Sequence, residues 1–248
     1  MKNLITTLLL FIGLSLNAQL TSVTEGGNTG QRLSTSNAAN HGDIGSNAVD
    51  LSYSSSSSTT RGATGFSSTA MGRSTTASAN YSTAMGSSTQ ATGVVSTAMG
   101  VSTTASGDYS TAMGNNTTAT GYSSTAMGLG TTASGDISNA MGYQTTASGD
   151  YSTAMGEETT ASDYASVVIG QYNSSGSTAT SADSFSTSAP AFVVGNGTDS
   201  SSRSDAFKVM FNGDTYVSNS LYLGGTEITS TATELNLLSG VTALGTGI

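Results

Sequence analysis

The chain of 248 residues has no cysteine, no tryptophan, one proline and only 8% charged residues. Because there is no cysteine, no disulfide bond can hold the chain together, and its stability must come from backbone pairing and assembly. Large apolar residues are too few for a conventional globular core, and the charge is lower than a disordered acidic chain usually carries. The remaining composition includes 31 glycines and is rich in Ser, Thr and Ala. It favours a thin, repetitive β architecture with a very small interior.

Positive charge is also scarce. No Lys or Arg occurs between Arg73 and Arg203, and the formal net charge of the whole chain is -9. A protein that binds nucleic acid needs cations to displace the counterions of the phosphates. The middle of this chain has none, so nucleic acid is a poor partner for it.

The common catalytic and metal-binding patterns are absent as well: the sequence has no G-x-S-x-G elbow, no P-loop and no H-E-x-x-H. The single histidine, His41, is expected to be a loop residue of an N-terminal cap, and a catalytic base needs a positioned partner that the sequence does not reveal. Methionine thioethers bind copper(I), but no His or Cys stands beside the methionines. We therefore predict a non-enzymatic protein without catalytic residues, cofactor or metal.

The N-terminus has the features of a secretory signal peptide. Lys2 supplies a positive charge, Leu4–Leu16 is apolar, and Ala18 offers a small residue for cleavage. A segment this short is not expected to span a bilayer. We predict a signal peptide over residues 1–18, an exported mature chain, and an N-terminal cap or flexible segment over residues 19–46.

A fixed period follows. A glycine recurs every 14 residues from Gly72 to Gly170, and a methionine precedes each one except the last, where isoleucine stands. Seven of the nine methionines fall into this one register. A period of this kind indicates a solenoid. The positions are Met71, Met85, Met99, Met113, Met127, Met141, Met155 and Ile169.

Each 14-residue unit has two halves, because alanine recurs every seven residues from Ala70 to Ala161. One half reads S-T-A-M-G and the other reads T-T-A-S-G. Seven residues hold one strand of about five residues and a tight corner. The sequence therefore predicts an all-β, parallel β-roll with two short strands per coil over residues 47–185, without helix from about residue 47 to 170.

Alternation along a strand assigns the side chains to faces. In residues 110–114, Ser110 and Ala112 share one face, whereas Thr111 and Met113 share the other. A coil this short encloses too little volume for methionine, so the small side chains point inward and the methionines outward. Stacked at about 4.8 Å per coil, the methionines form an apolar ladder. Such a ladder predicts an association face and a closed symmetric oligomer.

The opposite outer face is polar, and we expect a ligand to contact it. Its two columns of hydroxyls, together with two tyrosines of one register, form the predicted contact face: Thr104, Ser106, Thr118, Thr120, Thr132, Ser134, Tyr109 and Tyr151. The tyrosine register has a second interpretation, in which these rings cover corners of the roll or seams between subunits.

Glycines are expected at the corners because they tolerate positive φ. Ala79 replaces glycine at one second corner, and we expect that corner to have a different shape. Three aspartates, Asp108, Asp136 and Asp150, follow second-corner glycines. They are either solvated corner residues or an acidic row that binds an ion.

These units resemble a known family. The S-T-A-M-G and T-T-A-S-G halves, with "ASVVIG" at Ala165–Gly170, are similar to the head repeats of trimeric autotransporter adhesins of the YadA-like type. "NAVDLSYSSSSSTTRGATG" at Asn47–Gly65 resembles the segment that opens such heads. The resemblance implies a left-handed parallel β-roll, a homotrimer with the methionine ladder at its shared interface, and adhesion at the bacterial cell surface.

A second resemblance covers Pro190–Thr242, which looks like the neck segments of phage tail fibres and of related surface proteins, and we predict a neck over residues 186–248. The residue pattern predicts a hairpin with its turn at Asn212-Gly213 and a short helix from Thr231 to Leu238 with a capping box. The predicted strands are Phe192–Val194, Ala206–Phe211 and Thr215–Val217. Membrane-anchored adhesins of the first family end in a coiled coil and a barrel segment. Neither pattern occurs before Ile248, so either the chain continues beyond this residue or its anchorage depends on something else, and we expect a location at the bacterial cell surface or outside the cell.

Three functions compete at this point. The first is an exported adhesin head that attaches to host, matrix or other cells. The second is a structural spacer or fibre shaft. The third is ice binding through the regular Thr/Ser columns, against which Gln90 interrupts one column.

Overall fold

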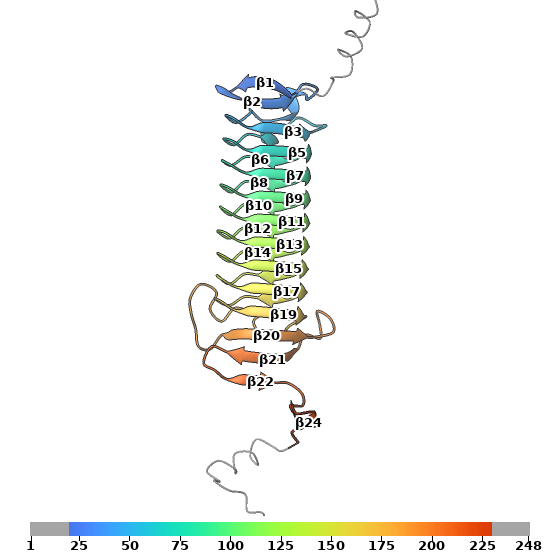
Figure 1. Cartoon of the computed structure of the whole chain (residues 1–248), viewed down its shortest axis with the longest axis vertical. Coiled ribbons are helices and arrows are strands. Elements are labelled where there is room, and N and C mark those ends of the chain that lie inside the picture. The colour runs from blue at the N-terminus through green and yellow to red at the C-terminus, as the bar shows by residue number, and fades with distance from the viewer. Residues whose placement is uncertain (1–19, 230–248) are drawn as a thin grey trace, which may run out of the picture.

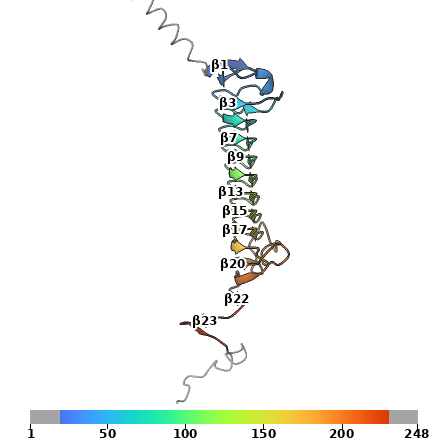
Figure 2. The ribbon, with the colours of Figure 1, turned by 90° about the vertical axis from the view of Figure 1, so that its right-hand side faces the viewer.

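The computed structural model describes residues 20–229. They form an all-β rod around a parallel solenoid of about 10 turns, with one 3-10 turn at Ala38–Asn40 (Figure 1). One sheet of 14 strands runs along the whole rod, and a second sheet of 8 strands runs beside it from β4 to β18. Seen from the side, the rod is thin (Figure 2). The all-β class and the parallel β-solenoid are thus confirmed.

The long sheet contains one strand of five residues from every coil. Neighbouring strands pair in parallel and in register, so that Met113 lies between Met99 and Met127. We call the outer face of this sheet the methionine face. Its strands are β3 (Val49–Tyr53), β5 (Thr69–Arg73), β7 (Thr83–Ser87), β9 (Thr97–Val101), β11 (Thr111–Asn115), β13 (Thr125–Leu129), β15 (Asn139–Tyr143), β17 (Thr153–Glu157) and β19 (Val167–Gln171).

The short sheet takes two residues from each coil, fewer than the five or so that the half-repeat predicts. Backbone bonds between coils nevertheless continue past the strand, as from Thr120 N to Ala133 O at 2.9 Å. The strands are β4 (Gly62–Ala63), β6 (Thr76–Ala77), β8 (Gln90–Ala91), β10 (Thr104–Ala105), β12 (Thr118–Ala119), β14 (Thr132–Ala133), β16 (Thr146–Ala147) and β18 (Thr160–Ala161).

The interior of the repeats holds only small side chains. Ala112 on the long sheet and Ser110 just before its strand have no exposed surface, and neither have Ala119 and Thr117 from the second half of the coil. The predicted inward set is therefore confirmed. Most inward hydroxyls of the central coils have no hydrogen-bond partner among the described residues. Close packing and the backbone ladders, rather than side-chain hydrogen bonds, hold these coils together.

The corners differ from the expectation. The glycine after each methionine does have positive φ, 122° at Gly114, and a Cβ there would lie 2.0 Å from the carbonyl oxygen of Gly128. The second-corner glycines do not have positive φ. They are needed because the next coil is too close: a Cβ on Gly107 would lie 2.0 Å from the oxygen of Gly121.

The left-handed position of the second corner lies two residues after the glycine, at Tyr109 with φ 60°. The corner that begins at Ala79 has the same shape, because Tyr81 also has φ 60° and Ser82 N donates to Ala79 O at 3.3 Å. The expectation of a different corner at Ala79 was wrong, since the residue that needs positive φ is not the one that is replaced.

Both ends of the solenoid add antiparallel strands to the long sheet. At the N-terminal end, β1 (Leu20–Glu25) and β2 (Asn28–Leu33) form a hairpin, and β2 pairs in parallel with β3. Residues 20–46 are therefore structured, and they contribute two strands of the sheet. Within residues 20–229, no helix has the length and apolar character needed to cross a membrane.

At the C-terminal end, β20 (Pro190–Asn196) continues the parallel sheet beside β19. β21 (Asp205–Met210) and β22 (Thr215–Val217) follow in antiparallel order, with Gly213 at φ 93° in the turn between them. The three predicted strands and their turn are confirmed. A small hairpin of β23 (Tyr222–Leu223) and β24 (Thr226–Glu227) comes next. The predicted helix at Thr231–Leu238 and the signal peptide lie outside the described residues.

Candidate functional site

The methionine face presents one methionine per coil on the outside of the roll. Met85 and Met155 are 37% exposed, and the other methionines of the ladder are half-buried. Ile169 continues the row next to Met155. A single chain thus leaves a continuous apolar ladder partly open to water, which is the property of an association surface.

The hydroxyl face lies on the short sheet. Thr104, Thr118 and Thr132 stand in register on successive strands and are half-buried. A second column, formed by Ser106, Thr120 and Ser134, is exposed. The structure brings these six predicted residues together in two straight columns.

The two tyrosines of the predicted contact face are not part of these columns. Tyr109 and Tyr151 lie at corners, about half exposed, and each meets another ring one coil further along. The ring centroids of Tyr109 and Tyr122 are 5.4 Å apart, and those of Tyr151 and Tyr164 are 5.2 Å apart, both edge-to-face. These pairs contribute to the stacking of neighbouring coils.

The acidic row also has a structural role, which sequence reasoning missed. One carboxylate oxygen of Asp108 accepts a hydrogen bond of 2.8 Å from the backbone N–H of Val94, in the preceding coil. Asp136 and Asp150 accept in the same way from Tyr122 and Asp136. Each acceptor is 14 residues from its donor, so the period itself was the signal. No group of three His, Cys, Asp or Glu within the described residues is placed to hold a metal ion.

Comparison with known families identifies the central part of the rod. A family model described as "YadA head domain repeat" matches residues 63–89, 91–117, 119–145, 138–156 and 147–173. The matched segments lie between residues 63 and 173 and are similar to YadA head repeats. A comparison with curated proteins gives no significant match. The methionine face, the hydroxyl columns and the aspartate row all lie within these YadA-like repeats.

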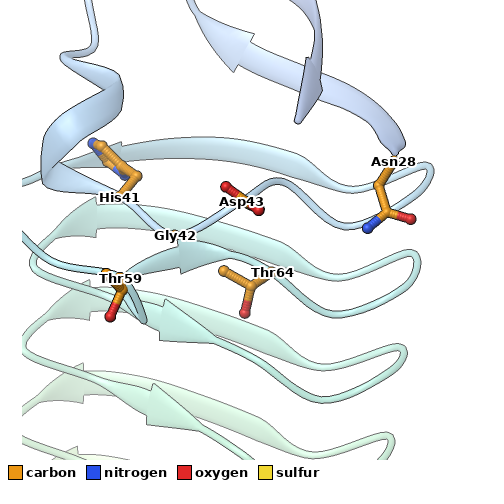
Figure 3. Close-up of a pocket in the computed structure, with 6 residues that line it drawn as sticks. All are labelled: Asn28, His41, Gly42, Asp43, Thr59 and Thr64. Atoms are coloured by element: carbon orange, nitrogen blue, oxygen red, sulfur yellow. The ribbon is translucent and has the colours of Figure 1, made fainter. Parts of the chain in front are cut away.

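A second candidate site lies at the N-terminal end of the rod, where the cap meets the first coils. An open hollow of about 420 Å³ is lined by Asn28, His41, Gly42, Asp43, Thr59 and Thr64 (Figure 3). His41 belongs to a loop of the cap, as expected, but it is only 6% exposed. Its Nδ1 atom lies 3.0 Å from Oδ2 of Asp50, which is the partner that the sequence did not reveal.

Asp50 is the centre of a buried polar cluster. Arg32 places Nε 3.3 Å from the same carboxylate and Nη1 2.7 Å from Glu25, while Ser52 donates to the other oxygen of Asp50 at 2.6 Å. Burial acts to raise the pKa of Asp50, but the hydrogen bonds from His41 and Ser52 and the charge of His41 outweigh it. The pKa of this carboxyl therefore lies below its ordinary value.

The cluster does not have the geometry of a nucleophilic triad. Ser52 Oγ lies 3.3 Å from His41 Nδ1, the same ring nitrogen that faces Asp50. A histidine that activates a serine uses one nitrogen for the serine and the other for the acid. The arrangement instead neutralises buried charges where β2, β3 and the loop of His41 meet.

Proposed function

We propose that this protein is the head of an exported, non-enzymatic surface adhesin, which assembles as a homotrimer and attaches to host, matrix or other cells. The observation that carries the proposal is the methionine face on coils that match YadA head repeats. A left-handed winding and the threefold arrangement belong to this proposal, through the resemblance to that family.

The energetics favour assembly through the methionine face. Burying a methionine side chain contributes roughly 1.5–3 kcal/mol when the side chain is fully removed from water. The ladder repeats this contribution on successive coils, whereas the hydroxyl columns offer no comparable driving force. Three chains that turn their methionines to one axis leave their hydroxyl faces outside, where a ligand can reach them.

Sedimentation velocity tests the assembly. The wild-type chain should sediment as a trimer, and a variant with Lys at Met99, Met113 and Met127 should sediment as a monomer, because charges would be buried against like charges at the axis. The matched control places Lys at Thr104, Thr118 and Thr132 on the opposite sheet and should remain trimeric. A monomeric wild-type chain, or a trimeric methionine variant, would contradict the proposal.

Attachment is tested by binding of the trimer to collagen, to fibronectin and to arrays of glycans. A spacer role is the second candidate, and one unbroken sheet from β1 to β22 supports it, because such a sheet makes a stiff rod. A trimer that binds none of these materials would favour the spacer. The in-register hydroxyl columns keep ice binding as a third candidate, which a thermal-hysteresis measurement decides.

A further inference from the structure

The two edges of the methionine sheet carry residues that vary from coil to coil. We define the leading edge as the residue two positions before each methionine strand begins, and the trailing edge as the last residue of that strand. The leading edge of the six central coils is Tyr81, Val95, Tyr109, Ser123, Ile137 and Tyr151. The trailing edge of the same coils is Ser87, Val101, Asn115, Leu129, Tyr143 and Glu157.

In each coil, the type of residue on the leading edge is related to the type of residue on the trailing edge. In the three coils with tyrosine on the leading edge, the trailing residue is small or polar. In the other three coils the trailing residue is apolar, so that Val95 shares its coil with Val101, and Ile137 shares its coil with Tyr143. Within one chain the two edges lie apart by the width of the sheet, about 20 Å for six residues of strand. No contact inside the chain therefore explains the match.

Backbone strain and exposure give a second, independent indication. Val95 and Ile137 have φ of 59° and 56°, where a β-branched residue is an outlier. Both side chains are exposed, and so are Val101, Leu129 and Tyr143 on the trailing edge. A serine takes the same left-handed position at Ser123. Residues that are strained, apolar and exposed lower the stability of a single chain. A contact that buries them against another chain would offset this loss of stability.

We propose that the leading edge of one chain packs against the trailing edge of its neighbour at the same coil level. This inference rests on the proposed trimer, in which three methionine faces share one axis and the edges of each sheet adjoin those of the next chain. In a trimer with threefold rotational symmetry, equivalent coils lie at equal height. Val95 of one chain then meets Val101 of the next chain, and Ile137 meets Tyr143.

We call this contact between a leading edge and a trailing edge the seam. It can fix the register of the chains, which the methionine ladder cannot do. The ladder presents the same residue at nearly every level, so a neighbour shifted by one coil would bury it equally well. The edges do distinguish the aligned arrangement from a displaced one. A displacement by one coil would place Val95 against Ser87 or Asn115, and Tyr109 against Val101 or Leu129. The ladder supplies affinity, and the seam selects the register in which the chains align.

Cysteine cross-linking tests the seam, because the chain has no cysteine of its own. A variant with Val95→Cys and Val101→Cys should form covalent trimers under mild oxidation, seen on a non-reducing gel. These two positions cannot bridge within one chain, since a disulfide needs Cα atoms within about 7 Å. Ile137→Cys with Tyr143→Cys is a second matched pair and should behave alike.

The control pairs Val95→Cys with Tyr143→Cys, three coils away or about 14 Å along the rod, and should give no covalent trimer. If sedimentation shows a trimer but neither matched pair cross-links, or the mismatched pair cross-links as well, the seam is overturned and the trimer stands. If the chain sediments as a monomer, the trimer proposal fails and the seam falls with it.

Discussion

The YadA-like repeats and the N-terminal cap belong to one sheet but are stabilised in different ways. Around Met113, each coil is joined to the next by backbone ladders and a small interior, which every neighbour repeats, and some pairs of coils are also joined by an aspartate bond such as that of Asp108. In the cap, a unique set of charged side chains is centred on Asp50, which is in register with the inward Ala70 of the first repeat. In the repeats, many equal contacts contribute to stability. The end of a solenoid instead needs one unique structure to cover it, because an open sheet edge would pair with other chains.

The C-terminal end is stabilised in the same way as the cap, by unique side-chain contacts rather than by repeated ones. Arg203 reaches back to Glu158 at 3.2 Å and lies over the ring of Tyr172. Asp205 accepts hydrogen bonds from the backbone of Ser174 and Ser175. Single long-range contacts therefore fasten both ends, and the difference between ends and centre can be tested by breaking each kind of contact.

The largest effect is expected from Asp50→Asn in the cap. This change leaves Arg32, which is almost fully buried, without its central carboxylate, and breaking a buried ion pair costs about 3–5 kcal/mol. Hydrogen exchange should show loss of protection in β1, β2 and β3, while the central coils stay protected. Asp183→Asn, at an exposed position, is the control. Equal loss in the central coils would show that cap and repeats unfold as one unit.

The second largest effect is expected from overpacking the interior of the repeats. Leu in place of Ala112 adds volume to an interior with no exposed surface at that position, which should destabilise the roll by about 1–3 kcal/mol per chain. Thermal unfolding should therefore occur at a lower temperature. Thr120→Leu, on the exposed hydroxyl column, should leave the transition nearly unchanged. A normal melting temperature for Ala112→Leu would contradict the inward assignment.

Acid should affect the cap before the repeats, with a smaller effect than Asp50→Asn. The pKa of Asp50 is lowered in the folded chain, so its carboxylate contributes stability above the ordinary value of about 3.9. This contribution is lost as the pH falls below that value towards the folded pKa. Hydrogen exchange in the cap between pH 6 and pH 3 measures it. In Asp50→Asn the cap should show a weaker pH dependence over this range.

The smallest effect is expected from a single rung of the aspartate row. Asp136→Ala removes the acceptor for Tyr122 N–H and should cost about 1 kcal/mol, the usual contribution of one hydrogen bond. Asp136→Asn keeps an acceptor and should be close to the wild type, as the chain itself uses Asn80 to accept from Phe66 N–H at 3.2 Å. Equal losses for Ala and Asn would show that charge, not the hydrogen bond, matters there.

Much of the repeat region could be predicted because its contacts repeat with the sequence. The period of Met113 and Gly114 and the alternation of Ser110 with Thr111 settled the two-stranded coil and its inward residues, since strand geometry allows one arrangement at that volume. The chain also indicated the C-terminal strands, because the turn at Gly213 separates two β-rich segments. For these elements local chemistry and tertiary structure agree.

The sequence alone determined the period, the faces and the sparse interior of this protein. Only the tertiary structure decided the partners of Asp108, His41 and Asp50, because each contact joins segments that the coil brings together and that no local pattern connects. It also decided that Tyr109, and not the glycine before it, takes the left-handed corner. Glycine is needed at Gly107 because a Cβ there would lie 2.0 Å from the carbonyl oxygen of Gly121, and that close approach exists only once the coils are wound.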